Sequence, residues 1–529
     1  MGKYPDKSDN SEKRTVGKAA GIVAVYTMLS RVLGLVRDMV IAGFFGASVS
    51  ADAFFVAFRI PNMLRRFTAE GSMTIAFIPV FTEYLKSRSK KEAFELARVI
   101  LTILSVILVF LTIAGIILSP WIVRLMAHGF GGESSKYELT VLLTRITFPY
   151  IFFVSIVAFF MGVLNCLKHF AAPAAAPIFL NLGIIGATLI ISPRLEEPVL
   201  GTAVGVLIGG VIQVMLQLPV VFKKGISLKP MWKPGHPAVK KIGMLILPAL
   251  FGSAVYQVNQ FAGTFLASYL PDGSISWLYY ADRLVELPLG VFAIAISTAA
   301  LPSLSRQAVD KDRSAFTDTI DHALKVTFFI SIPSLTGLIV LGEPVIRLFF
   351  QRGAFDAMSC EMTYRALVFY AAGLWAFSGV KVVVSAFYAL QDTITPVKIS
   401  VITFVSYLFL GIMLMGPLAH GGLALALSLS SAINFVLLVF MLKKRIEGWK
   451  IRSVIFSLFR IILSSMIMGF SVYLIRMEVF PFGPDQGTID LAVEVAVLVS
   501  AGMIIYLLAA MILRCRELNA FKGLIKNRK

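Results

Sequence analysis

The chain has 529 residues, of which 57% are hydrophobic and only 15% are charged. A soluble globular protein carries about 25% charged residues, so this composition excludes an ordinary soluble domain and predicts an integral membrane protein. The net charge of +19 does not indicate a nucleic-acid partner, because the basic residues lie between apolar blocks. Three widely separated cysteines and five scattered histidines give neither a disulfide framework nor a metal-binding motif, so no metal site is expected.

Apolar blocks of about 18 residues or more predict membrane-spanning helices along the whole chain. Fourteen spans are expected, at 17–45, 51–85, 93–119, 138–165, 174–192, 198–222, 242–270, 275–305, 323–341, 362–390, 394–416, 420–442, 453–475 and 488–513. The first block is too long and too charged for a cleaved signal peptide, and we expect it to be retained. The expected fold class is therefore an all-α polytopic membrane protein with about 14 transmembrane helices.

Lysine and arginine are concentrated in alternate connections between these spans. They gather in "KSRSKK", "KKGISLKPMWKPGHPAVKK", "RQAVDKDR", "KKRIEGWKIR" and the C-terminal "RCRELNAFKGLIKNRK". Because cytoplasmic loops carry an excess of Lys and Arg, this bias predicts that both termini are cytoplasmic.

Weak internal similarity predicts two lobes of six spans each. "GVLNCLKHFAAPAAAPI" and "SAFYALQDTITPVKI" align Pro173 with Pro396, and the same offset aligns Pro79 with Pro302. An even number of spans in each unit implies a parallel, pseudo-twofold repeat, as in transporters that bind substrate between their halves. We expect a cytoplasmic tail (1–16), an N-lobe (17–222), a cytoplasmic linker (223–241), a C-lobe (242–445), two C-terminal spans (446–513) and a cytoplasmic tail (514–529).

The first two spans carry charges that a lipid-facing helix would not tolerate. "SRVLGLVRDMV" contains Arg31, Arg37 and Asp38, and one charge at the centre of a span costs roughly 2.5–3.5 kcal/mol on insertion scales. Arg31 and Asp38 share a helix face, with Arg37 at its edge. The second span adds Asp52, Arg59, Arg65, Arg66 and Glu70. These charges are expected to face a water-filled cavity rather than lipid.

The second half contributes a matching group of charges. "SWLYYADRLVELPLGVF" holds Asp282, Arg283 and Glu286, and Lys381 lies within another span, where it is expected to face the cavity. The surplus of arginine predicts an anionic substrate, because guanidinium forks bind phosphate oxygens in pairs. Two alternatives remain open: the acids Asp38, Asp52, Asp282 and Glu286 form internal ion pairs that lock helices together, and Arg65 and Arg66 extend to the cytoplasmic interface.

Several function classes lack a sequence signal. The chain has no phosphate-binding G-x-x-x-x-G-K-[ST] loop, and we identify no nucleophile–base pair or metal cluster in its apolar segments. No catalytic residue is therefore assigned, and any uphill work would draw on an ion gradient or the membrane potential. Asp392, in the turn "QDTITP", is expected to cap the span that follows it.

The arginine-bearing segments resemble a known family. "SRVLGLVRD", "ADAFFVAFRIPNMLRRFTAEG" and "WLYYADRLVELPLGVF" look like signature segments of the MurJ (MviN) lipid II flippases, within the multidrug/oligosaccharidyl-lipid/polysaccharide exporter superfamily. The resemblance extends through nearly the whole chain. It implies alternating-access transport of undecaprenyl-diphosphate-linked peptidoglycan precursor from the inner to the outer leaflet of the bacterial cytoplasmic membrane, for cell-wall synthesis. The partners implied are lipid II and the phospholipid bilayer, and cell-wall synthesis enzymes are a further candidate.

The resemblance also implies roles for particular residues. Arg31, Arg37, Asp38, Asp52, Arg65 and Arg283 match family positions needed for function. Among them, Arg37, Arg65 and Arg283 match positions that engage the diphosphate and headgroup, so the substrate site is expected at Arg31, Arg37, Arg65 and Arg283. Glu70 and Glu286 fall within family motifs, and the last two spans resemble a groove for the lipid tail.

The coupling ion is left open by the sequence. Some family members hold a sodium ion among spans 7, 11 and 12 with acidic ligands, and here spans 7 and 11 carry no internal carboxylate. Sodium, protons or the membrane potential are the candidates for coupling, and no other cofactor is expected.

Two rival functions are also considered. A multidrug/cation antiporter, or another polysaccharide-lipid exporter, would share the fold, but an antiporter's cavity should be dominated by carboxylates. A membrane scaffold for cell-wall enzymes would need no alternating access and would tolerate neutral replacement of its arginines.

Overall fold

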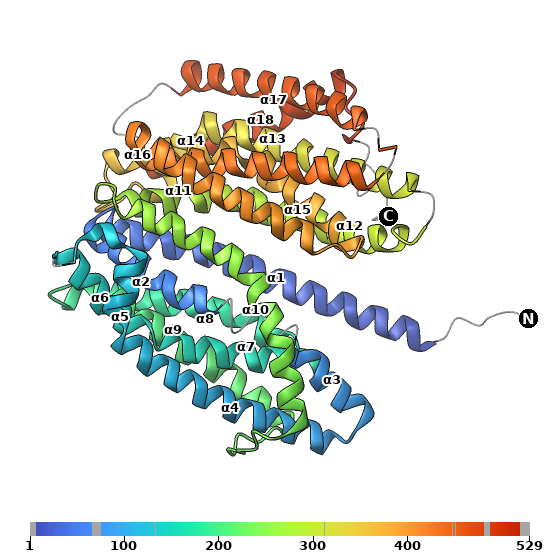
Figure 1. Cartoon of the computed structure of the whole chain (residues 1–529). Helices are drawn as coiled ribbons and strands as arrows, with labels where there is room; N and C mark the ends of the chain where they lie inside the picture. Colours follow the sequence, from blue (N-terminus) through green and yellow to red (C-terminus); the bar gives the residue numbers. More distant parts are fainter. Residues whose placement is uncertain are drawn as a thin grey trace, which may run out of the picture. The chain divides into compact units, whose positions relative to one another are not determined.

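The computed structural model describes residues 7–65, 76–132, 134–310, 313–446, 448–449, 451–480 and 487–518. Every regular element within these ranges is a helix (Figure 1), which confirms the all-α class. The chain packs as two compact units, Met1–Asp272 and Gly273–Lys529.

Helices of the first unit follow the predicted apolar blocks. They are α1 (Lys7–Phe45), α2 (Val49–Arg65), α3 (Ile78–Ser87), α4 (Lys90–Ile117), α5 (Ser119–Met126), η2 (His128–Phe130), α6 (Ser135–Thr147), α7 (Tyr150–Cys166), α8 (Ala171–Ile190), η3 (Ser192–Arg194), α9 (Val199–Lys223) and α10 (Pro237–Ala267). Helix α8 packs against both α1 and α9. A Cβ added at Gly183 would lie 2.6 Å from the Cα of Gly209, so glycine is what lets the α8 and α9 backbones approach this closely.

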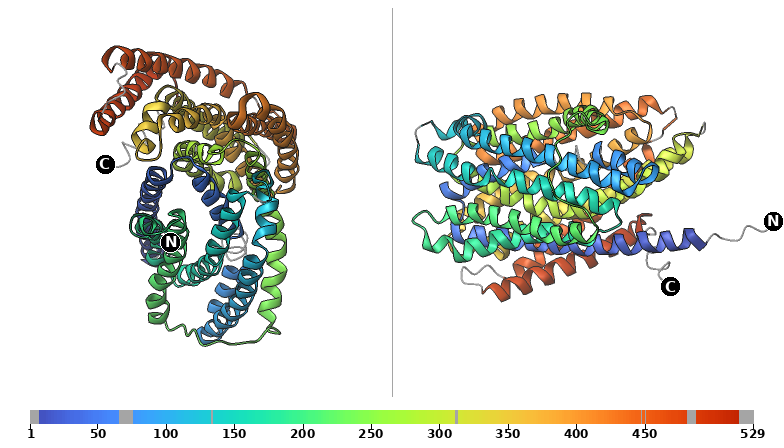
Figure 2. Two further views of the ribbon diagram at one scale, coloured as in Figure 1. Left: turned by 90° about the vertical axis from the view of Figure 1, so that its left-hand side faces the viewer. Right: turned by 90° about the horizontal axis from the view of Figure 1, so that it is seen from below.

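Helices of the second unit surround α13. The elements are α11 (Ser274–Pro288), the π-helical segment η4 (Leu289–Ala293), α12 (Ile294–Gln307), α13 (Ser314–Phe350), α14 (Ala357–Ala372), α15 (Leu374–Ala389), α16 (Ile394–Arg445), α17 (Arg452–Val479) and α18 (Thr488–Ile512). Helix α13 contacts α12, α14, α15, α17 and α18. In the end-on view of Figure 2, the helices within each unit run roughly along a common direction.

Helix α16 combines two predicted spans. Its 52 residues are interrupted at Ala419, whose φ of 50° and ψ of −132° are not helical. At 1.5 Å per residue, the parts before and after this break are each long enough to cross a hydrocarbon core about 30 Å thick. The break therefore falls between the predicted spans 394–416 and 420–442.

Eight of the described helical segments are long and apolar enough to cross a membrane, or nine if the bent pair α14 and α15 counts as one span. The total of fourteen stays a prediction, and the predicted span 51–85 includes residues 66–75, which lie outside the described ranges. The apolar face of α4 is largely exposed, and Phe110 on it is 71% exposed. A continuous exposed apolar face of this kind suits contact with lipid chains.

The connection between α9 and α10 lies against α4. The Arg98 side chain donates to the carbonyl oxygen of Lys229 at 3.0 Å, and the Met231 amide donates to the Thr102 hydroxyl at 2.9 Å. Helix α10 accordingly packs within the first unit, whose limit is Asp272. The predicted lobes, their boundaries at 223–241 and the internal repeat stay predictions.

Candidate functional site: buried and half-exposed charge clusters

Arg37 and Asp38 of α1 form a buried ion pair. Arg37 is 7% exposed and Asp38 is 1% exposed. The Nε and Nη2 atoms of Arg37 donate to Oδ1 of Asp38 at 3.0 and 2.7 Å. The carboxylate thus neutralises the guanidinium within the unit, which is the arrangement expected of a charge pair removed from water.

Asn181 of α8 completes this cluster. Its Oδ1 accepts from Nη1 of Arg37 at 3.1 Å, and its Nδ2 donates to the carbonyl oxygen of Ser30 at 3.1 Å. A Cβ at Gly34 would lie 3.8 Å from Asn181 Nδ2, so the amide sits close against the α1 backbone. The guanidinium plane is therefore fixed by two helices, which gives it a defined orientation.

The remaining cationic residues of α1 and α2 differ in exposure. Arg31 is exposed, whereas Arg65, the last residue of α2, is half-buried.

Asp52 is held by a lysine that the sequence analysis did not single out. Asp52 is 1% exposed in the first turn of α2, and Lys136 Nζ of α6 donates to its Oδ2 at 2.8 Å. The same ammonium donates to Oδ1 of Asp272 at 2.7 Å and lies 4.2 Å from the centre of the Phe130 ring. Lys136 thus connects α2 to the last residue of the first unit.

Arg59 points toward α10. Its Nη1 donates to the Thr264 hydroxyl, which in turn donates to the carbonyl oxygen of Gln260 at 3.0 Å. Arg66 and Glu70 lie outside the described residues, so their predicted roles stay predictions.

The second unit carries its own charge cluster on α11. Arg283 Nη1 lies 3.0 Å from Oε2 of Glu286, and Nη2 donates to the hydroxyl of Tyr279 at 2.7 Å. The guanidinium carbon also lies 4.7 Å from the centre of the Tyr279 ring, within the range of a cation–π interaction. The side chains of Arg283 and Glu286 are 35% and 47% exposed. This pair is therefore partly accessible to solvent, whereas the Arg37–Asp38 pair is buried.

Asp282 and Lys381 belong to the second unit as well. Asp282 is half-buried beside Arg283, and Lys381 is exposed on α15. The Lys381 carbonyl oxygen accepts hydrogen bonds from Ser297 of α12 at 3.1 Å and from Ser385 at 3.0 Å. These contacts involve only the backbone of Lys381. That its side chain faces a cavity stays a prediction.

The partner residues Asn181, Lys136 and Tyr279 were absent from the sequence prediction. Asn181 is a single amide in the apolar helix α8, which is a recognisable signal for a buried hydrogen bond. Lys136 lies just before a predicted span, a position that suggests an exposed residue at the membrane surface. Tyr279 lies four residues before Arg283, so helical spacing alone brings the two together.

The predicted cap at Asp392 is confirmed. Its Oδ1 accepts from the amides of Ile394 and Thr395 at 3.1 and 3.0 Å, and Oδ2 pairs with Arg445. Burial raises the pKa of this carboxyl, but the hydrogen bonds from Thr395 and Ile394 and the Arg445 charge outweigh it, so the pKa is lowered.

Comparisons with known proteins place this arrangement in a family. The family model described as "Lipid II flippase MurJ" matches residues 41–483. The chain is 42% identical over 428 residues to "Probable lipid II flippase MurJ" of Vibrio cholerae, covering 80% of this chain and 82% of that relative. It is 38% identical over 427 residues to "Lipid II flippase MurJ" of Burkholderia cenocepacia, covering 80% and 83% of the two chains.

Solved structures agree. A structure titled "Lipid II flippase MurJ, inward closed conformation" matches with a TM-score of 0.78 at 29% identity, over 95% of this chain and 99% of that chain. A multidrug resistance MATE family transporter of the MOP superfamily matches with a TM-score of 0.63 at 14% identity, over 80% and 98%; this second likeness shows a shared fold alone. The chain is a multi-pass membrane protein and belongs to the MurJ family of lipid II flippases.

Proposed function

We propose that this chain is a lipid II flippase of the bacterial cytoplasmic membrane. The observation that carries the proposal is the family match over residues 41–483, together with the MurJ names of relatives that are 38–42% identical to this chain over 427–428 aligned residues. In this role the chain moves a membrane-bound precursor across the bilayer and makes or breaks no covalent bond.

In the proposed mechanism, arginine side chains bind the substrate diphosphate. Arg31, Arg37, Arg65 and Arg283 are assigned this role, because bidentate guanidinium–phosphate pairs are strong and keep their charge at any physiological pH. Asp38 holds the Arg37 guanidinium in place through two hydrogen bonds. An incoming diphosphate would compete with Asp38 for these donors, which couples substrate binding to the packing of α1 against α8.

The orientation and energy source are further parts of the proposal. Both termini are placed in the cytoplasm on the basis of the Lys and Arg bias, and the lipid tail is placed beside α17 and α18. Transport of an anionic headgroup responds to the membrane potential, at about 2.3 kcal/mol per charge for each 100 mV. Sodium or proton coupling would add to this term.

The test is lipid II exposure on the outer leaflet of cells depleted of this chain. Re-expressed wild type should restore exposure, and Arg37→Ala at matched membrane abundance should not. Arg88→Ala is the matched control, since Arg88 is an exposed arginine whose partner is the exposed Glu92; it should behave as wild type. Normal exposure during depletion, in a strain with no second flippase, would contradict the proposal.

A further inference from the structure

The break in α16 is held by residues outside the charge clusters described above. Ala419 has a φ of 50° and a ψ of −132°, a backbone conformation that residues with a side chain rarely adopt. Such a conformation persists only where the surrounding structure fixes it. A Cβ at Gly421 would lie 2.9 Å from the Phe369 ring of α14, and one at Gly422 would overlap the carbonyl oxygen of Leu414. The break is therefore tightly packed against α14.

His420, between Ala419 and these glycines, is buried and bound to α14. It is 2% exposed, and its Nε2 lies 2.8 Å from the carbonyl oxygen of Met362. A carbonyl oxygen only accepts, so Nε2 carries a hydrogen and donates it. Burial and this hydrogen bond together give the imidazole ring a fixed orientation at the break.

The imidazole ring packs against the first turn of α11. The centres of the His420 and Trp277 rings are 4.9 Å apart, and the ring planes are inclined by 52°, which is the spacing of a packed aromatic pair. The indole N–H of Trp277 is buried and has no hydrogen-bond partner among the described residues. Ring packing therefore positions this indole, and its aromatic partner is His420.

Helix α11 presents Trp277 and Arg283 on opposite faces. At 3.6 residues per turn, Trp277 shares one face with Tyr280, which is fully buried. The opposite face carries the cluster of Tyr279, Arg283 and Glu286. The packing of the Trp277 face thus sets the rotation of α11 about its axis, and with it the direction in which Arg283 extends.

We propose that His420 is a positioning residue for Arg283. It holds Trp277 from the break in α16, and through Trp277 it holds the rotation of α11. The inference rests on the proposed function, because it takes Arg283 as a ligand of the substrate diphosphate. Binding groups must be held within about half an ångström of their working positions, so a turn of α11 would weaken substrate binding without removing any charge.

The experiment is a double-mutant cycle on lipid II affinity, measured by native mass spectrometry with the purified full-length chain. It compares the wild type, His420→Ala, Arg283→Gln and the double variant. His420→Ala should weaken lipid II binding by about tenfold. It should have no further effect once Arg283 is Gln, because a positioning residue acts only through the group that it positions.

Two more variants separate positioning from folding. His420→Gln keeps a neutral donor for the Met362 carbonyl oxygen and a planar group against Trp277, so it should bind lipid II nearly as the wild type does. Trp277→Leu should reproduce the effect of His420→Ala, and the two changes together should weaken binding no more than either alone. The unfolding midpoint of each variant, measured beside its affinity, identifies any variant that fails to fold.

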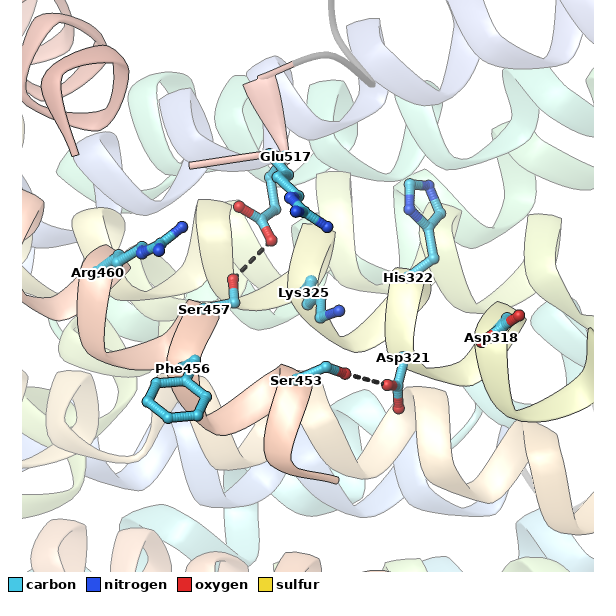
Figure 3. A pocket seen from close by; sticks show the side chains of 10 residues that line it. Asp318, Asp321, His322, Lys325, Ser453, Phe456, Ser457, Arg460 and Glu517 are labelled. Carbon is cyan, nitrogen blue, oxygen red and sulfur yellow. Dashed lines mark hydrogen bonds between the residues drawn. The ribbon is translucent and has the colours of Figure 1, made fainter. Parts of the chain in front are cut away.

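The matched control is His322→Ala. His322 is an exposed histidine of the second unit, and it lines a polar pocket formed by α13, α17 and the segment that follows α18 (Figure 3). Because this pocket is made by elements other than α11 and α16, the control should bind lipid II as the wild type does.

A second readout is independent of substrate. A nitroxide spin label at Leu287→Cys, about one turn after Arg283, reports the order of α11 by its EPR line shape. Leu287 is 38% exposed, and Cys166 is replaced by serine because the other two cysteines are buried. His420→Ala and Trp277→Leu should raise the mobility of the label, whereas His322→Ala and His420→Gln should not. If the wild type bound no lipid II, the proposed function would fail, and the label would still decide whether His420 holds α11.

Two outcomes would overturn the inference. The first is an equal loss of lipid II affinity from His420→Ala in the wild-type and Arg283→Gln backgrounds, which would make His420 a general structural residue. The second is that His420→Ala leaves either the affinity or the mobility of the label unchanged.

Discussion

The Arg37 cluster of the first unit and the Arg283 cluster of the second use the same charged groups in different surroundings. Arg37 and Asp38 are 7% and 1% exposed and are fixed from a second helix by Asn181. Arg283 and Glu286 are 35% and 47% exposed and are neighbours on one helix, steadied by Tyr279. Burial and the number of helices involved therefore separate two pairs that look alike in sequence.

This difference determines what each arginine contributes. A buried pair carries a large desolvation cost that only its partner offsets, so removing one member is far more damaging than removing both. A half-exposed pair is screened by water and contributes little to stability. We expect stability and transport to be lost together in the first cluster and separately in the second.

The largest effect is expected for Arg37→Ala. The substitution leaves the buried Asp38 carboxylate without its main donor, which should cost about 3–5 kcal/mol of stability. The measurement is the apparent unfolding midpoint of the purified chain in detergent, with lipid II exposure in cells as the functional readout.

The double variant Arg37→Met/Asp38→Leu sharpens this test. Replacing both members with apolar side chains removes the unpaired charge, so the free energy of unfolding should return to within about 1 kcal/mol of wild type. Transport should remain lost, because Arg37, the residue assigned to bind the substrate diphosphate, is still absent. A double variant that transports lipid II would show that the pair serves only to hold α1 and α8 together.

Lys136 allows a comparison between its two ion pairs, one with the buried Asp52 and one with the exposed Asp272. Lys136→Met removes the partner of Asp52, which is 1% exposed, and should cost about 3 kcal/mol. Asp272→Asn removes the negative charge of a side chain that is 61% exposed and pairs with the same ammonium, and it should cost less than about 1 kcal/mol. Equal shifts of the two unfolding midpoints would contradict the role assigned to burial.

Asp392 provides a capping contribution that depends on pH. Asp392→Ala removes the cap of α16 and the Arg445 pair, which should cost about 1 kcal/mol at pH 7. Because the pKa of Asp392 is lowered in the folded chain, its contribution is full above the ordinary value of about 3.9 and is lost as the pH falls through the folded pKa. The difference between the unfolding midpoints of wild type and variant should therefore stay constant down to about pH 3.9 and shrink only below it, and a difference that persists at lower pH would contradict this account.

Sequence reasoning predicted the helical architecture because its signals are local. Apolar length located the helices, the turn "QDTITP" identified Asp392 as a cap, and the predicted spans 394–416 and 420–442 correspond to the two parts of α16 on either side of Ala419. The predicted total of fourteen spans stays a prediction, because only eight or nine described segments are long and apolar enough to be recognised as spans. Helices that carry several charges or that bend do not stand out by length and hydropathy.

The candidate site was predicted in part. Charges at membrane depth marked Arg37, Asp38 and Asp52 as special, and one of the two interpretations considered for them, internal ion pairing, describes the contacts that Arg37 and Asp38 make. The identity of partners could not be predicted, since Asn181 and Lys136 lie 144 and 84 positions from the residues they bind. Such pairings depend on helix packing, which no local pattern encodes.

The smallest effect on stability is expected for the Arg283 cluster, although its effect on transport should be large. Arg283→Gln and Glu286→Gln should each change the stability by less than about 1 kcal/mol, because water screens the pair. Arg283→Gln should nevertheless lower lipid II transport by about tenfold or more, the loss expected for a charged hydrogen bond to phosphate. Arg283→Lys should fall between wild type and Gln, since lysine keeps the charge and loses both the fork and the stacking on Tyr279. Arg88→Gln, which removes an arginine that is 55% exposed, should change neither readout. If Arg283→Gln instead lowered the unfolding midpoint as much as Arg37→Ala, the two clusters would contribute equally to stability, and their different exposure would not explain their roles.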